Sequence, residues 1–187
     1  QTTVGDVLAS EIGYLSGEFI AYEKMTVRQF FEYMKSLHPF DNQKYLKELI
    51  GLFKLNNKKK IGELSKGNRQ KVGIIQALMH QPKLLILDEP TGGLDPLMQE
   101  TFYQLIRDSK AKGVTAFISS HNLTEVKKMC DRVGIIRDGE LVAEKTIEDL
   151  AQEAQQSLSI TFDGSMPNVA ELRKLNCVRS VVSENKN

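Results

Sequence analysis

Residues 84–87 form a continuous apolar run, Leu-Leu-Ile-Leu, that is followed at once by Asp88 and Glu89. Such a run is typical of a β-strand that is covered on both faces, as in a parallel sheet. Helical patterns flank it: residues 67–80 precede it, and residues 97–112 follow and end at Gly113, a helix-ending glycine. Strands that alternate with helices indicate parallel pairing through crossover connections. The run therefore predicts an α/β fold with a parallel sheet.

The remaining periodicity extends this pattern in both directions. We expect short strands at residues 12–15, 114–120 and 133–137, and a short helix at residues 123–129. Asp138-Gly139 is a hairpin signal that joins residues 133–137 to residues 141–143. A strand at 158–162, a helix at 169–175 and a strand at 178–182 predict a small C-terminal βαβ appendage.

Two amphipathic helices are expected before the α/β run. The first starts at Thr26, which forms a capping box with Gln29, and Pro39 stops it. The second starts near Asp41, and the lysines at positions 58–60 then form a solvated loop. The chain opens with Gln1 rather than methionine and closes just after an apolar run, so we interpret both ends as cut.

Composition narrows the class of protein. The 187 residues carry a net charge of +1, which gives no electrostatic reason to expect a nucleic-acid partner. Cys130 and Cys177 show no CxxC or Cys/His spacing, which favours two reduced thiols over a disulfide or a metal site. No apolar stretch approaches the roughly 20 residues of a membrane helix, and no signal peptide opens the chain. A role at a membrane would be exerted from the water side.

Asp88 and Glu89 are the first candidate site residues. They end an apolar strand, and ligands of open α/β sheets gather at the carboxyl ends of the strands. Neighbouring side chains on a strand point to opposite sides, so one carboxylate can hold a magnesium ion while the other orients or deprotonates a water. The alternative is a pair of surface acids at a loop entry.

Three further segments belong with this pair. Residues 91–96, Thr-Gly-Gly-Leu-Asp-Pro, form a glycine-rich turn that carries another carboxylate. Residues 64–70 open a helix, with Ser65 as its cap and Gly67 placed to let an anion approach the free backbone N–H groups. His121 ends the next strand, so its imidazole is either a phosphate contact at the same sheet edge or incidental.

The order of these segments resembles the ABC (ATP-binding-cassette) ATPases. By that resemblance Ser65, Lys66, Gly67 and Asn68 belong to the signature, and Gly93 and Asp95 to the D-loop, both of which bind nucleotide. Asp88 would organise Mg²⁺ in the Walker B strand, Glu89 would be the catalytic carboxylate, and His121 would be the switch histidine that contacts the γ-phosphate of ATP.

The chain departs from the family pattern in several places. Asn68 stands where the signature has glutamine, and Gly92 stands where serine often precedes the D-loop. The Q-loop glutamine is missing near Gly17, where Glu18 is the neighbouring polar residue. The sequence contains no Gly-x-x-x-x-Gly-Lys-[Ser/Thr] loop, whose amides and lysine cradle phosphates. We therefore expect little or no ATP hydrolysis by these 187 residues alone.

The resemblance implies a P-loop NTPase-type core with an inserted helical subdomain and the C-terminal appendage. Residues 1–25 would be a remnant of the N-terminal core with the Q-loop region, and residues 26–63 the helical subdomain. Residues 64–150 would hold the signature, Walker B, D-loop and histidine switch, and residues 151–187 the appendage. The Tyr-Leu-x-Gly-Glu form and the appendage resemble the multidrug and antibiotic exporter branch.

By the same resemblance the protein is the ATP-hydrolysing motor of a membrane transporter. Its partners would be a transmembrane permease subunit and a second ATPase subunit, identical or different, at the cytoplasmic face of the membrane. A soluble ABC ATPase that acts on nucleic acid or the ribosome is the alternative, although such relatives carry paired cassettes or coiled-coil insertions. A non-catalytic interaction module is a third reading, against which Glu89 and His121 argue.

Overall fold

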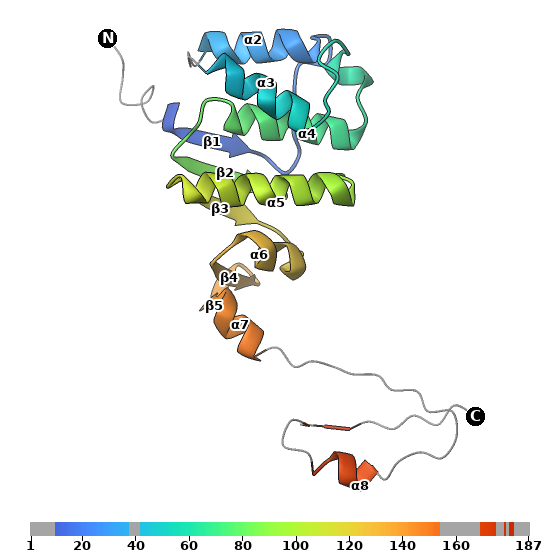
Figure 1. Ribbon diagram of the computed structural model, residues 1–187, viewed down its shortest axis with the longest axis vertical. Helices are drawn as coiled ribbons and strands as arrows, with labels where there is room; N and C mark the ends of the chain where they lie inside the picture. Colours follow the sequence, from blue (N-terminus) through green and yellow to red (C-terminus); the bar gives the residue numbers. More distant parts are fainter. Residues whose placement is uncertain (1–9, 38–41, 154–168, 175–177, 179, 182–187) are drawn as a thin grey trace, which may run out of the picture. The chain divides into compact units, whose positions relative to one another are not determined.

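The computed structural model describes residues 10–37, 42–153, 169–174, 178 and 180–181. Its central element is a parallel sheet in the order β1 (Ile12–Leu15), β2 (Leu84–Asp88) and β3 (Thr115–Ser119) (Figure 1). Helices connect the strands in crossovers, as the alternation of patterns predicted. The α/β class with a parallel sheet is therefore confirmed.

Two helices follow β1 in the sequence, α2 (Val27–Leu37) and α3 (Gln43–Leu52). The predicted capping box is present: the Thr26 N–H donates to Gln29 Oε1 at 2.9 Å, and the Gln29 N–H donates to Thr26 Oγ1 at 3.2 Å. Asn42 caps α3 by accepting from the N–H of Tyr45. Pro39 and Asp41, expected at the end of one helix and the start of the next, lie outside the described residues.

The helices that flank β2 and β3 follow. A 3₁₀ turn, η1 (Ile61–Glu63), leads into α4 (Lys66–Leu78), so the helix begins one residue before the predicted start and ends two residues before His80. α5 (Pro96–Ala111) connects β2 to β3, and Gly113 follows it at φ 88° as the expected helix-ending glycine. α6 (Leu123–Met129) has the predicted bounds.

A hairpin follows the sheet. β4 (Arg132–Arg137) and β5 (Glu140–Thr146) pair antiparallel around a turn in which Asp138 and Gly139 both have positive φ, 52° and 83°. Positive φ at both positions is the tight hairpin geometry that Asp-Gly favours, and a bulge interrupts the ladder between Ile135 and Ile136. α7 (Ile147–Glu153) comes next.

The chain divides into two compact units, residues 1–149 and 150–187. In the second unit the structure describes α8 (Val169–Leu172), within the helix predicted at 169–175. The strand predicted at 158–162 lies outside the described residues, as does Cys177. Residues 178, 180 and 181 of the strand predicted at 178–182 are described, and they are not assigned to a strand. The domain boundaries inferred from the family resemblance stay a prediction.

The two faces of the three-stranded sheet differ in burial. Leu15, Leu85 and Leu87 point to one side, which we call the closed face, and are 1%, 0% and 2% exposed. α4 packs so closely there that a Cβ on Gly13 would lie 2.0 Å from the Ala77 carbonyl oxygen. The interior of this side is continuous with the buried residues of α2, α3, α4 and α5.

The opposite side, which we call the open face, is lined by Tyr14, Ile86 and Phe117, aligned across the three strands. Tyr14 is 56% and Phe117 69% exposed, and Ile86 is half-buried. The apolar run at 84–87 was expected to be covered on both faces. Among the described residues only one face is covered, because the helices that contact the sheet pack on the closed face.

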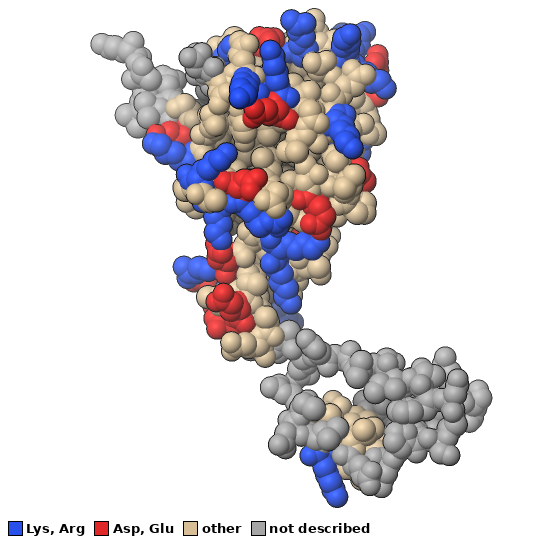
Figure 2. Space-filling view, viewed as in Figure 1, with Lys and Arg blue, Asp and Glu red and all other residues tan. Residues whose placement is uncertain are grey.

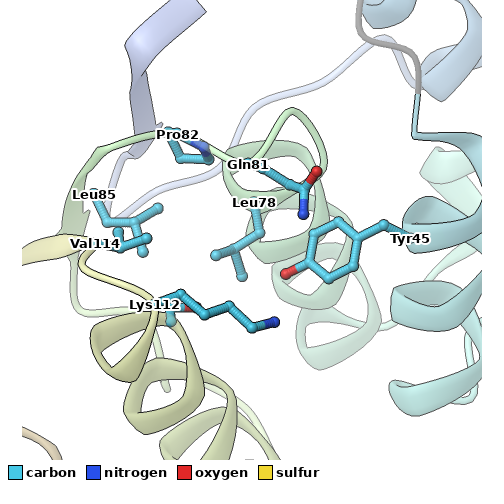
Figure 3. A pocket seen from close by; sticks show the side chains of 8 residues that line it. Tyr45, Leu78, Gln81, Pro82, Leu85, Lys112 and Val114 are labelled. Atoms are coloured by element: carbon cyan, nitrogen blue, oxygen red, sulfur yellow. The ribbon is translucent and has the colours of Figure 1, made fainter.

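The surface of the protein has two further features. A small pocket is lined by Tyr45, Leu78, Pro82, Leu85 and Val114, together with neighbouring polar side chains (Figure 3). It lies where β2 and β3 begin, at the opposite end of the strands from Asp88. Figure 2 shows basic and acidic side chains interspersed over the visible surface. Among the residues with described structure, none of the helices is long and apolar enough to cross a membrane.

Candidate functional site

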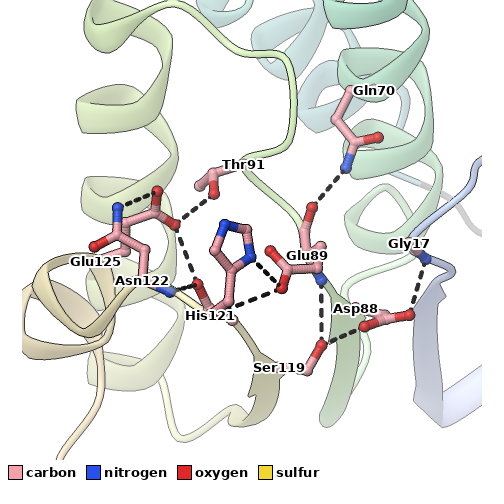
Figure 4. Close-up of polar contacts among 10 residues, drawn as sticks. Gly17, Gln70, Asp88, Glu89, Thr91, Ser119, His121, Asn122 and Glu125 are labelled. Carbon is pink, nitrogen blue, oxygen red and sulfur yellow. Dashed lines mark hydrogen bonds and ion pairs between the residues drawn. The ribbon is translucent and has the colours of Figure 1, made fainter.

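Asp88 lies at the carboxyl end of β2, between the ends of β1 and β3 (Figure 4). Its Oδ2 accepts a hydrogen bond from the backbone N–H of Gly17 at 3.2 Å, and its Oδ1 accepts one from the Ser119 hydroxyl. A Cβ on Gly17 would lie 2.8 Å from Oδ2, so a side chain at position 17 would displace the carboxylate. The backbone of Gly17, near which the resemblance places a Q-loop glutamine, therefore contacts the Asp88 carboxylate directly.

Glu89 is held by the ends of two strands. Its backbone φ is 44°, a left-handed conformation that costs a non-glycine residue about 1–2 kcal/mol. Its N–H donates to the carbonyl oxygen of Ser119 at 3.2 Å. Its Oε1 lies 3.0 Å from the backbone N of His121 and 2.7 Å from His121 Nδ1. The two residues predicted to act together are therefore in direct contact.

The imidazole of His121 is 88% exposed, and the carboxylate of Glu89 is 35% exposed. The hydrogen bond with Glu89 is the largest influence that raises the pKa of His121, followed by the negative charge of Glu89. Slight desolvation lowers this pKa and the charge of Glu125 raises it. The net direction is upward, so the site favours the imidazolium form of His121.

A buried carboxylate supports the loops that carry Glu89 and His121. Glu125 on α6 is 9% exposed, and its Oε2 accepts from the hydroxyl of Thr91, 4% exposed, at 2.5 Å. Its Oε1 accepts from Asn122 Nδ2 at 3.1 Å. Buried polar groups of this kind are costly to leave unpaired, so the contacts fix both loops to α6.

The residues predicted to form the signature lie at the start of α4, beside the glycine turn. Ser65 caps the helix by accepting from the N–H of Asn68 at 3.3 Å. Gly67 faces the turn directly, since a Cβ there would lie 2.2 Å from the Gly93 carbonyl oxygen. Asp95 caps α5 by accepting from the N–H of Met98 at 3.0 Å. The start of α4 and the glycine turn at residues 91–96 are therefore packed against each other within one chain.

The structure brings the predicted residues together in two groups. One, at the sheet edge, contains Asp88, Glu89 and His121. The other, at the start of α4 and in the adjoining turn, contains Ser65, Lys66, Gly67, Asn68, Gly93 and Asp95. Glu18 is exposed, and its backbone carbonyl accepts a hydrogen bond from Ser16 Oγ.

Four residues with a structural part in the site were not singled out from the sequence: Gln70, Thr91, Ser119 and Glu125. Thr91 lies within the segment 91–96, and Ser119 lies two residues before His121, so the sequence showed their positions but not their roles. Gln70 gave a stronger signal, because it stands among apolar neighbours on the buried side of its helix. Only the fold shows which loop its amide reaches.

The chemistry of Asp88 suits a magnesium ion that is shared with phosphates. Mg²⁺ is commonly bound through one or two carboxylates while phosphates and waters complete the octahedron. Asp88 is exposed, and the adjacent Ser119 hydroxyl adds an oxygen. Within the described ranges no group of three or more His, Cys, Asp or Glu side chains is placed to hold a metal by itself. The donor set fits an ion that arrives with a nucleotide.

The sequence is similar to those of known ABC transporter proteins. A sequence model of the ABC transporter family matches residues 4–92. The chain is 36% identical over 165 residues to the uncharacterized ABC transporter ATP-binding protein YhaQ of Bacillus subtilis, covering 85% of this chain and 55% of YhaQ. It is 43% identical over 112 residues to the bacitracin transport ATP-binding protein BcrA of Bacillus licheniformis, covering 59% and 36%.

The fold is shared as well. A solved ATP-binding subunit of an ABC transporter superposes with a TM-score of 0.74 at 26% identity, covering 80% of this chain and 65% of that one. The chain spans about half the length of the curated relatives it matches, for example 55% of YhaQ.

Proposed function

The chain carries an ABC transporter ATP-binding domain, and from this premise we propose that it works in the ATP-hydrolysing motor of a membrane transporter. In this proposal Asp88 organises Mg²⁺, Glu89 orients and deprotonates the attacking water, and His121 contacts the γ-phosphate. The relatives named for antibiotic transport, such as BcrA, favour an exporter.

The contact between Glu89 and His121 carries this proposal. A carboxylate with a histidine at 2.7 Å, next to the exposed Asp88, stands at the carboxyl edge of a parallel sheet, where α/β proteins bind ligands. An imidazolium there can stabilise negative charge that develops on a transferring phosphoryl group. A carboxylate beside it can hold a water in line for attack.

The second group of residues has a different proposed task. Ser65, Lys66, Gly67 and Asn68 lie at the free end of α4, where backbone N–H groups and the helix dipole favour an anion. We assign them, with Gly93 and Asp95, to the nucleotide of a second ATPase subunit, identical or different. ATP would close such a pair and hydrolysis would release it.

Cofactor and location follow from the same assignment. ATP with Mg²⁺ is the proposed cofactor, and the proposed position is peripheral, at the cytoplasmic face, against a transmembrane permease subunit. The 187 residues include no Walker A loop, so we expect them to hydrolyse little ATP alone. A longer protein with that loop upstream should be a competent ATPase.

The test is Glu89→Gln in the longer protein, with Asp108→Asn as the matched change at an exposed position of α5. Glu89→Gln should still bind ATP and dimerise, because an amide keeps the shape of the carboxylate. Its turnover should fall by about 10²-fold or more, because the group that activates water is lost. Steady-state phosphate release and gel filtration with ATP measure the two properties. Turnover equal to that of Asp108→Asn would remove Glu89 from this role.

A further inference from the structure

Gln70 is a buried amide that lies between the two groups of site residues. It is in the second turn of α4 and is 5% exposed. Its Nε2 donates to the carbonyl oxygen of Glu89 at 3.2 Å (Figure 4) and to that of Pro90 at 3.0 Å. A side-chain amide nitrogen has two hydrogens, so these two carbonyls use its full donor capacity.

The first of these carbonyls belongs to Glu89, one of four described non-glycine residues whose backbone φ is positive. Glu89 has a φ of 44°, and such a conformation persists only where its surroundings over-determine it. The Ser119 contact fixes the peptide before Glu89, and Gln70 fixes the peptide after it. The two peptides set the direction of the Glu89 side chain toward His121.

The helix that carries Gln70 connects this peptide to the signature. Ser65, Lys66 and Gly67 lie one turn before Gln70, at the start of α4. A helix transmits displacement of one turn to the next as a nearly rigid unit. A shift at the start of α4 would therefore move the donor that fixes the backbone of Glu89.

We propose that Gln70 is a positioning residue that couples the start of α4 to the carboxylate of Glu89. The inference rests on the proposed function for the roles of these two sites. It adds a link within one chain: the end of α4 that faces the nucleotide of a second subunit holds the water-activating residue of its own site. Thr91 and Glu125 fix the next part of the same loop to α6, so Gln70 supplies the connection to α4.

The experiment compares Gln70→Leu with Gln76→Leu, the same change at a partly exposed position six residues further along α4. In the longer protein, Gln70→Leu should lower kcat for ATP hydrolysis by about 10- to 100-fold, because a small misplacement of a catalytic group has effects of that size. The KM for ATP should stay within about twofold, because no group that binds ATP is removed. Gln76→Leu should leave both constants unchanged.

A second measurement does not depend on ATP hydrolysis. In the 187-residue chain, NMR titration of His121 reports its contact with Glu89, which raises the pKa of the imidazole. Gln70→Leu should move that pKa toward the ordinary histidine value, and Gln76→Leu should not. If the longer protein hydrolyses no ATP, the proposed function fails, and the His121 titration still tests the role of Gln70.

A folded Gln70→Leu variant with unchanged kcat and an unchanged His121 titration would overturn the proposal. If this variant does not fold, the side-chain amide protons of Gln70 in the unaltered chain decide the question. Exchange much slower than that of the Gln76 amide supports the coupling. Exchange at the same rate as Gln76 refutes it.

Discussion

The closed and open faces of the sheet are built from the same three strands, and they differ in what covers them. Leu85 on the closed face is 0% exposed, whereas Phe117 on the open face is 69% exposed. Side chains alternate between the two faces along a strand, so Asp88 lies on the same face as Ile86, and Ser119 on the same face as Phe117. Both residues end their strands on the open face. The closed face therefore accounts for stability, and the open face leads to the proposed chemistry.

This difference has a physical basis in the strand period. Every second side chain of β2 packs against helices on the closed face. The side chains between them do not pack against helices among the described residues. A large apolar area left exposed is itself a signal for a partner surface. We expect substitutions to divide in the same way, with large effects on stability at the closed face and small ones at the open face.

The largest loss of stability should come from Leu85→Ala, and Ile86→Ala at the next position is the variant to compare with it. Leu85→Ala opens a cavity under α4 and α5, and we expect it to lower the free energy of unfolding by about 2–5 kcal/mol. Ile86→Ala removes a half-buried side chain and should cost about 1 kcal/mol, mainly in strand preference. Urea denaturation followed by circular dichroism measures both. Equal losses would show that the two faces do not differ.

A smaller loss is expected at the buried support of the site. Thr91→Val keeps the shape of the side chain and removes the hydroxyl that Glu125 accepts at 2.5 Å. Hydrogen bonds to buried charged groups contribute about 1.5–3 kcal/mol, so the variant should lose stability in that range. Thr101→Val is the control. The Thr101 hydroxyl donates to the carbonyl oxygen of Leu97 in the same helix at 2.9 Å, and this hydrogen bond is exposed. A loss no greater than that of the control would contradict a supporting role for Glu125.

The open face should be the most tolerant part of the sheet. Phe117→Ser removes an aromatic ring that is 69% exposed, and we expect a change within about 0.5 kcal/mol in the 187-residue chain, apart from the lower strand preference of serine. The same variant should aggregate less, because the apolar stripe of Tyr14, Ile86 and Phe117 is broken. Light scattering at rising concentration tests this. A loss as large as that of Leu85→Ala would mean that the stripe is packed.

The division between the faces also explains what the sequence could predict. The parallel sheet, the bounds of α6, the capping box at Thr26 and the hairpin turn at Asp138 follow from local periodicity and turn chemistry, which act over a few residues. The apolar run at 84–87 could not show whether both faces of its strand are buried, because that depends on which other elements pack against the sheet. Local sequence patterns likewise could not predict the contact of Gln70 with the Glu89 backbone or that of Thr91 with Glu125, because these residues are 19 and 34 positions apart.

The smallest effect on stability, and the most informative about the site, is expected for Glu89→Gln in the 187-residue chain. The hydrogen bond and the charge of Glu89 raise the pKa of His121, so removing the charge should lower this pKa toward the ordinary value. NMR titration of the His121 imidazole measures the change, and Asp108→Asn at an exposed position of α5 should leave it unchanged.

The sign of the accompanying pH dependence is fixed. A pKa that is raised in the folded state means that the charged pair stabilises the fold fully below the ordinary pKa of histidine, and that this contribution is lost as the pH rises through the raised value. The difference in melting temperature between the native chain and Glu89→Gln should therefore be largest at acidic pH, provided that Glu89 is still ionised. It should shrink through neutrality, and salt should reduce it because the imidazole is 88% exposed. A difference that grew with rising pH would mean that Glu89 meets a neutral imidazole, and the electrostatic part of the proposed switch would have to be abandoned.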